Sequence, residues 1–448
     1  MQAPVAYGID FGTSNSAIAV AFDDGSVQVL AVPKTITETV IYLHRNANQL
    51  TGEDAIRAYL STSGVRSNCS SCALVDWSAG VANTDCRSFE PAGSCFDARL
   101  IAQLKSDVAN PAFAQTHSWA HDFNVEMLIA VVLRWLKVRA DQQVNSDVQR
   151  VTIGHPVRFA GADGPDFRDR QAVGQQRLIG GGRLAGFSEH VGLMEESKAA
   201  VAADGVERGV LVCLDFGGGT FDVAIVDVDE SRSTVLALNG VAVGGEEFDS
   251  KIFEAIVAPS LGLNSEFTLM NGQRRNLPAS LRSRLRSLGG INDLKAENLA
   301  AGVSSYLSGL GNDEVLRSIS SLVNGGASWP MFQAIRRAKH ELSTSDASVI
   351  DVRSLEFNLQ LPLTRHDFNS IIAKDLDRVR YCYQDALEDA DVEPDAVDYV
   401  ALTGGSSQIQ AFREMVARDF PVSKFVELNP FTSVVQGLAR HAFEEWAT

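Results

Sequence analysis

Two segments in different halves of the chain follow one template, and this internal repeat restricts the fold more than any other feature. The first segment, GIDFGTSNSAIAV, covers residues 8–20, and the second, CLDFGGGTFDVAIV, covers residues 213–226. Each has an apolar strand that ends in Asp-Phe-Gly, a turn of small residues with a threonine, and a second apolar strand. The repeat predicts two similar α/β halves that meet at facing hairpin turns.

The turns of the two segments suit phosphate chemistry. Three consecutive glycines at 217–219 cost backbone entropy and supply no packing. Some other group must therefore approach the main chain closely there, which requires residues without side chains. Backbone N–H groups and the hydroxyls of Thr13, Ser14 and Thr220 can donate to phosphate oxygens. The carboxylates of Asp10 and Asp215 make sense beside phosphate if Mg²⁺ or its waters lie between them. Two facing turns of this kind predict a clamp for a polyphosphate.

A third glycine turn, LTGGSS at residues 402–407, follows a strand and opens a helix, which suits a nucleoside. Apolar spacing predicts further helices over residues 123–141, 168–178, 197–204 and 367–390, and a mostly helical stretch over 255–343. Strands are predicted at residues 27–32, 150–157, 234–243 and 349–361.

Composition narrows the class of protein. The 448 residues carry a formal net charge of −17, which argues against a nucleic-acid-binding role for the whole protein. The chain has no apolar run near the roughly 20 residues that span a bilayer, and its N-terminus does not resemble a signal peptide. We therefore expect a cytoplasmic protein with no membrane and no nucleic-acid partner.

Four of the six cysteines crowd one segment, and their role is open. In a cytoplasmic chain a cluster indicates a metal more than disulfides, so zinc or an iron–sulfur cluster is one interpretation. Reduced thiols in a loop insertion over about residues 61–96 are the other. The four residues are Cys69, Cys72, Cys86 and Cys95.

The three glycine turns resemble, in order and spacing, the phosphate-1, phosphate-2 and adenosine motifs of the actin, sugar-kinase and chaperone superfamily. VGGEEFD (243–249), RRAKHELSTS (336–345) and EESKAAVA (195–202) resemble segments of the DnaK-type heat-shock chaperones within it. The resemblance implies an actin-like ATPase fold of the α/β class, with two ribonuclease-H-like lobes around a nucleotide cleft. Lobe I would be residues 1–205 with a closing helix at 430–448, and lobe II residues 206–429 with its helical tip at about 255–343.

The resemblance also implies ATP or ADP and Mg²⁺ as ligands, and it assigns roles to residues. Asp10 and Asp215 would organise magnesium, mainly through water, and Glu195 would match the acid of the connecting helix. Thr220 and Asp222 would lie by the γ-phosphate and the attacking water. The phosphate-binding set would be Gly12, Thr13, Ser14, Asn15, Gly217, Gly218, Gly219, Thr220, Gly244, Gly245 and Glu246. The nucleoside-binding set would be Lys339, His340, Ser343, Gly404, Gly405, Ser406, Gln408 and Ile409.

Some positions of the resemblance are open or altered. The lysine near the γ-phosphate matches Lys105 best, with Arg99 as the competing alignment. Arg336 stands where the family usually has an acidic ribose contact, and His340 and Gln408 replace two arginines that sandwich adenine. Because stacking and cation–π contributions are lost, we expect weaker nucleotide binding than in full chaperones.

The motifs run to residue 446 and the chain then ends, as in the short chaperone-like proteins of the YegD type, so we expect no peptide-binding domain. The predicted function is a slow DnaK-like ATPase that acts by lobe closure on an unknown client or co-chaperone. One alternative is a small-molecule kinase, for which the sequence offers no acid beyond the metal set. The other is a nucleotide-gated scaffold or filament.

Overall fold

The residues that the computed structural model describes make up most of the chain. They are residues 2–44, 48–63, 98–111, 113, 115–118, 121–160, 167–201, 208–229, 232–268, 273–296, 313–323, 326–353, 358–420, 424–426, 428–429 and 432–447.

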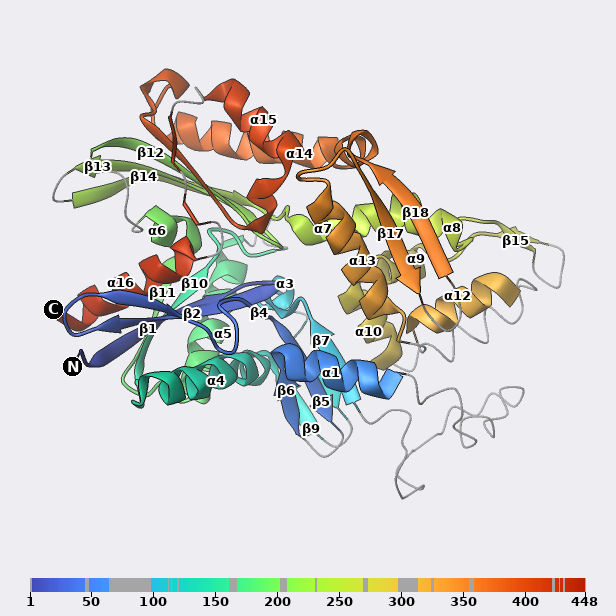
Figure 1. Cartoon of the computed structure of the whole chain (residues 1–448), viewed down its shortest axis with the longest axis horizontal. Helices are drawn as coiled ribbons and strands as arrows, with labels where there is room; N and C mark the ends of the chain where they lie inside the picture. Colours follow the sequence, from blue (N-terminus) through green and yellow to red (C-terminus); the bar gives the residue numbers. More distant parts are fainter. Residues whose placement is uncertain are drawn as a thin grey trace.

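Two large sheets with the same local plan form the centre of the molecule (Figure 1). The first has the order β11-β10-β1-β2-β3, and the second has the order β14-β13-β12-β19-β20. In each, a central strand pairs antiparallel with the strand after its hairpin and parallel with a strand far along the chain. The repeat in the sequence is therefore a repeat in the topology.

The predicted hairpins lie at the centres of these sheets. The first sheet contains β1 (Pro4–Phe11), β2 (Asn15–Phe22), β3 (Val27–Leu30), β10 (Arg150–His155) and β11 (His190–Glu195), with β4 (Thr37–Glu38) paired to β2. The second contains β12 (Gly209–Phe216), β13 (Phe221–Asp229), β14 (Arg232–Val241), β19 (Tyr399–Thr403) and β20 (Phe425–Val426). The apolar strands β1 and β12 are almost wholly buried, as expected of strands covered on both faces.

Helices cover the faces of both sheets. In Figure 1, α4 (Val125–Val144) and α5 (Phe167–Ala185) lie below the first sheet, and α14 (Arg365–Asp389) and α15 (Gln410–Asp419) lie above the second. The last helix, α16 (Ser433–Ala447), returns to pack its small residues against alanines of β2, and it also contacts α6 (Glu196–Val201). A mixed cluster that includes Leu211, Cys213 and Leu438 joins the two sheets through these two helices.

The remaining elements lie at the edges of this core. Near the first sheet are β5 (Val40–His44), β6 (Gln49–Thr51), α1 (Gly52–Ser63), β7 (Ala98–Ala102), α3 (Leu104–Asp107), β8 (Gln115–Ser118) and β9 (His121–Asn124). The sequence predicted none of these. Beyond the second sheet are β17 (Ala347–Arg353) and β18 (Asn358–Thr364), which match the strands predicted at 349–361.

The stretch predicted as mostly helical is helical where it is described, with one short hairpin added. Helix α7 (Gly245–Ile252) precedes it and continues into the π-helical η4 (Phe253–Val257). The other elements are α8 (Ala258–Ser260), β15 (Phe267–Thr268), β16 (Arg274–Arg275), α9 (Ala279–Leu285), α10 (Leu288–Ala296), α12 (Asp313–Val323) and α13 (Ser328–Glu341). Pro330 sits in the first turn of α13, where a helix tolerates proline. Of the helices described, none is long and apolar enough to cross a membrane.

Candidate functional site

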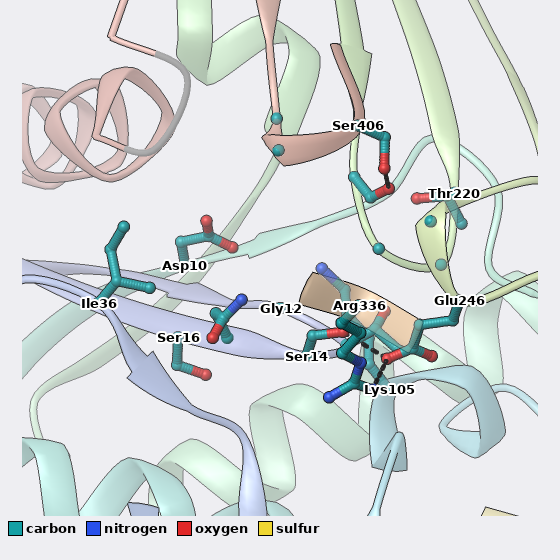
Figure 2. A pocket seen from close by; sticks show the side chains of 18 of the residues that line it. Asp10, Gly12, Ser14, Ser16, Ile36, Lys105, Thr220, Glu246, Arg336 and Ser406 are labelled. Carbon is teal, nitrogen blue, oxygen red and sulfur yellow. Dashed lines mark hydrogen bonds and ion pairs between the residues drawn. The ribbon is translucent and has the colours of Figure 1, made fainter. Parts of the chain in front are cut away.

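A cavity of about 370 Å³ opens between the two large sheets, where the β1–β2 and β12–β13 turns face each other (Figure 2). Most of the site residues that were predicted from the sequence lie on its wall. These are Asp10, Gly12, Thr13, Ser14, Asn15, Lys105, Asp215, Gly217, Gly218, Gly219, Thr220, Gly245, Glu246, Lys339, His340, Ser343, Gly404, Gly405, Ser406 and Ile409.

The two facing turns approach each other closely. A Cβ atom on Gly219 would lie 2.6 Å from Thr13 Oγ1, and one on Gly218 would lie 3.0 Å from Ser14 Oγ. At Gly217 a Cβ atom would meet nothing closer than the Thr220 carbonyl oxygen at 3.5 Å. The opposite turn therefore leaves little room for a side chain at two of the three glycines, a reason that the sequence alone did not supply.

The third glycine turn is fixed to the second hairpin. Gly404 has φ +78°, and a Cβ atom there would lie 2.4 Å from the Phe216 carbonyl oxygen. The Ser406 hydroxyl donates to the Gly217 carbonyl oxygen at 2.7 Å, a contact that Figure 2 shows. The short 3₁₀ turn η6 (Gly405–Gln408) then leads into α15. The third motif thereby reaches the same cavity as the first two.

The floor of the cavity concentrates buried carboxylates around one lysine. Lys105 forms an ion pair with Glu196, and both side chains are more than nine-tenths buried. Burial, and then the Glu196 carboxylate, raises the pKa of Asp10 to about 7. The same two causes, in the same order, raise the pKa of Asp222 to about 7 and that of Asp215 well above its ordinary value. Because these carboxylates repel one another in a site that excludes water, the floor of the cavity favours the binding of a cation.

Burial lowers the pKa of Lys105, but Glu196 and then Asp10 raise it by more, so the net pKa stays above its ordinary value. The Lys105 side chain is therefore charged, and it is held under the two hairpins.

One wall of the cavity is a charge network between α7 and α13. Lys339 Nζ donates to the Gly245 carbonyl oxygen at 2.6 Å and lies 2.6 Å from Asp249 Oδ1. Arg336 Nε donates to Asp249 Oδ2 at 3.2 Å, and its guanidinium lies 3.7 Å from Glu246 Oε1. The Ser14 hydroxyl donates to Glu246 Oε1 at 2.5 Å, so the network crosses the cavity to the first hairpin (Figure 2).

Comparison with known proteins gives this arrangement a family. The family model described as Hsp70 protein matches residues 6–261 and 326–442. The chain belongs to the Hsp70 family. Its fold is the actin-like ATPase fold, with two ribonuclease-H-like lobes around a nucleotide cleft, as the motifs predicted.

Curated Hsp70 relatives match at low identity along nearly the whole chain. Chaperone protein DnaK of Thermosipho melanesiensis is 24% identical over 443 residues, and that of Thermosipho africanus is 25% identical over 443 residues. Both matches cover 97% of this chain. The iron-sulfur cluster biogenesis chaperone of Saccharomyces cerevisiae mitochondria is 22% identical over 454 residues and covers 96% of this chain. The chain spans 58% of the length of each of these relatives. Members of the Hsp70 family are chaperones that bind ATP and ADP.

Four residues that the Hsp70 resemblance assigned to the site are not on the cavity wall, although the structure describes them all. They are Glu195, Asp222, Gly244 and Gln408. Asp222 lies beneath the floor, where its Oδ1 accepts from the Val157 N–H at 2.8 Å. Gly244 lies under the second hairpin, where a Cβ atom would be 2.3 Å from the Gly218 carbonyl oxygen. The Gln408 amide donates to Ser407 Oγ at 3.5 Å.

Glu196, rather than Glu195, occupies the floor of the Hsp70 cavity. Glu195 ends strand β11, whereas Glu196 opens helix α6 and is buried against Lys105. Two consecutive glutamates fit the motif equally well in the sequence, so only the point at which the strand becomes a helix distinguishes them.

The structure also adds residues that the motifs missed. Ser16, Ala17, Ile36, Glu38, Glu196, Asp249, Gln333 and Val434 lie on the cavity wall, together with Arg336. Among these, Ile36 and Glu38 come from a part of the chain to which no motif was assigned, and no sequence signal marked them. Val434 belongs to the predicted closing helix, but nothing in the sequence placed it at the cavity.

The structure distinguishes the two candidates for the cation near the terminal phosphate, but it does not describe the four clustered cysteines. Lys105 lies in the cavity, while Arg99 is in strand β7, which pairs with β5 away from the cavity lining. Cys69, Cys72, Cys86 and Cys95 lie outside the described residues. Within the described residues, no three His, Cys, Asp or Glu side chains are grouped to bind a metal directly.

Proposed function

We propose that the cavity binds ATP and ADP with Mg²⁺ and hydrolyses ATP slowly. The observation that carries this proposal is that two glycine hairpins face each other above buried carboxylates and Lys105. Backbone N–H groups and hydroxyls of both hairpins provide the donors that a polyphosphate requires.

In this proposal the residues divide the work of phosphoryl transfer, which is mainly positioning and charge neutralisation. Asp10 and Asp215 would hold the magnesium ion, mainly through its water ligands. The ion supplies charge neutralisation between the carboxylates and the phosphates. Lys105 stabilises charge on the terminal phosphate, and Glu196 holds Lys105 in place.

Thr220 and Asp222 support the attacking water in the same proposal. Thr220 lies on the cavity wall, and its side chain donates a hydrogen bond to Asp222 that offsets part of the rise in the pKa of that carboxyl. Asp222 is in turn fixed by the Val157 N–H. Asp222 therefore acts as a positioning residue, because its carboxylate lies below the cavity wall.

We further propose that nucleotide changes the closure of two lobes, residues 1–205 with 430–448 and residues 206–429, and that a client or co-chaperone reads the change. The packing of α16 on β2 supports the return of the C-terminal helix to the first lobe. The bond from Ser14 to Glu246 supports contact between the lobes at the cavity.

Calorimetric titration with ATP and a phosphate-release assay test the proposal. Binding that needs Mg²⁺, together with slow hydrolysis that Thr220→Ala abolishes, is the expected result. A folded protein that neither binds nor hydrolyses ATP would refute it.

The adjacent glutamates provide a first specific prediction. Glu196→Gln should lower the hydrolysis rate by roughly tenfold or more, because it removes the charge that holds Lys105. Glu195→Gln, the matched control, should leave the rate within about twofold, since its side chain is not on the cavity wall. Single-turnover phosphate release measures both. Equal losses in the two variants would contradict the structural assignment.

The altered adenine platform provides a second prediction. We expect a dissociation constant for ATP above the nanomolar range. His340→Arg should tighten binding by about fivefold, since His340 lies on the cavity wall and arginine adds a cation–π contact. Gln408→Arg should tighten it less, because Gln408 lies off the wall. Calorimetry with ATP compares the variants, and an equal gain from both would contradict this placement.

One observation favours a kinase as the second candidate. Glu38 lies on the cavity wall, and its buried Oε2 has no hydrogen-bond partner among the described residues. This carboxylate is an acid beyond the predicted metal set and is a candidate base for an acceptor hydroxyl. ATP turnover that a sugar or a carboxylate metabolite accelerates strongly, and that Glu38→Gln returns to the basal rate, would favour the kinase.

A further inference from the structure

Residues 273–288 are strongly basic in an otherwise acidic chain. The stretch QRRNLPASLRSRLRSL contains Arg274, Arg275, Arg282, Arg284 and Arg286. The sequence has no Asp or Glu between Glu266 and Asp293, although the whole chain has a net charge of −17. A local positive field on a negative molecule marks a surface that attracts acidic partners.

The fold exposes Arg274 and Arg282 on the outside of the helical tip. Four leucines at 277, 281, 285 and 288 anchor α9 and its flanks in the core, each at most 6% exposed. Arg282 is left exposed, and the Arg274 side chain is 78% exposed. In Figure 1, α8, α9 and β15 lie at the end of the molecule opposite both termini.

A groove of about 280 Å³ runs beside this basic surface. Its walls are η4 with α8 and the following turn on one side, and α9 on the other. Phe253, Leu263 and Leu285, each at most 2% exposed, form the apolar interior, and the rim includes Arg282 and Glu254.

The charged side chains at the rim of the groove do not all have an oppositely charged neighbour. Glu254 lies 3.7 Å from Arg286, so this acid has a basic neighbour in the same surface. Arg282 makes no ion pair with any residue that the structure describes. The rim therefore keeps one exposed cation directly beside an apolar groove. The Arg274 guanidinium is also exposed, and it lies 3.7 Å from Glu266.

We propose that this groove is a docking site for an acidic peptide segment of a partner protein, with a Leu or Phe side chain seated between α9 and η4. The apolar interior suits such a side chain, and the arginines suit the acidic residues that flank it. The buried apolar interior of the groove needs an aliphatic or aromatic side chain to fill it, which makes a polypeptide a better match than nucleic acid.

The groove is separate from the nucleotide cavity but shares an element with it. Glu246 and Asp249 of α7 line the cavity, and the same helix continues as η4, whose Phe253 and Glu254 line the groove. The five-residue π-helical stretch begins where α7 ends, and π-helical turns are frequent at functional sites. The docking site would therefore contact the far end of a helix whose first turn belongs to the cavity.

Fluorescence anisotropy with labelled twelve-residue peptides tests the proposal on the full chain. The probes are a peptide of Asp, Glu, Leu and Phe, a copy with Lys in place of the acids, and a copy with Ser in place of Leu and Phe. We expect only the first to bind measurably. Arg282→Glu should weaken its binding by roughly fivefold or more, and Ala279→Phe, which fills the groove without a change in charge, should weaken it as well.

Arg208→Glu is the charge-reversal control, because the Arg208 side chain is 78% exposed just before β12, 3.9 Å from Asp229 and outside the groove. It should leave peptide binding unchanged, and ATP titration checks that each variant keeps its nucleotide cavity. The proposal is overturned if acidic and basic peptides bind alike or if Arg208→Glu weakens binding as much as Arg282→Glu. It is also overturned if a single-stranded oligonucleotide or a second copy of the chain, rather than the peptide, shows the dependence on Arg282.

Discussion

Lys105→Met should lower the rate of ATP hydrolysis by about a hundredfold or more, because charge stabilisation at the transferred phosphate contributes on that scale. The same change leaves Glu196 as a buried carboxylate without its ion-pair partner. We therefore also expect the free energy of unfolding to fall by about 3 kcal/mol. Single-turnover hydrolysis and urea denaturation measure the two effects.

A double variant separates the two consequences. Lys105→Met with Glu196→Gln removes both charges, so it should regain much of the stability while hydrolysis stays low. Lys374→Met on the exposed side of α14 is the surface control and should change neither quantity. Full activity in Lys105→Met would show that Lys105 is a structural cation and would reopen the case for a different catalytic group.

Gly437→Val should destabilise the whole protein by about 3 kcal/mol or more. A Cβ atom at this position in α16 would lie 1.8 Å from the Ala199 carbonyl oxygen in α6, which is impossible without movement of a helix. The neighbouring crossing of α16 over β1 is as close, since a Cβ atom on Gly8 would lie 2.2 Å from the Ala439 nitrogen. Thermal or urea unfolding followed by circular dichroism checks the prediction.

Gln436→Ala is the control within the same helix, because its side chain is only partly buried and alanine favours a helix. It should change the free energy of unfolding by no more than about 0.5 kcal/mol. If Gly437→Val were as stable as this control, the close packing of α16 on α6 would be wrong.

The hairpins and the cavity could be predicted because their signals are local. Asp-Phe-Gly followed by small residues fixes a strand end and a turn within a few positions, and the repeat indicates that two such turns face each other. Gly404 in the third turn has a positive φ, and in the sequence only the glycine pattern indicates it. These three signals predicted the parts of the cavity wall that the glycine turns form, and the family match supports the fold that they implied. The resemblance to the chaperones supplied a second part of the wall: Lys105, Gly245, Glu246, Lys339, His340 and Ser343.

The parts that escaped prediction depend on contacts between distant segments. Strand β5 pairs with β7, whose residues follow a long intervening segment, so no local pattern reveals the partner. Glu38 reaches the cavity because β4 pairs with β2 at Asn15, a pairing of a two-residue strand. Arg336 stands out in the sequence only as a departure, and its pairing with Asp249 depends on how α7 and α13 lie together.

The bond from Ser14 to Glu246 has a consequence for any ligand of the cavity. A serine hydroxyl has one hydrogen to donate, and Ser14 gives it to Glu246 across the gap between the hairpins. A phosphate oxygen that takes this hydrogen must therefore take it from Glu246, whose carboxylate still has the Arg336 guanidinium 3.7 Å away. The hydrogen bond from Ser14 to phosphate would replace the one from Ser14 to Glu246, so its net contribution to affinity is the difference between the two. Losing the bond to Glu246 would also weaken the link between the two sides of the cavity.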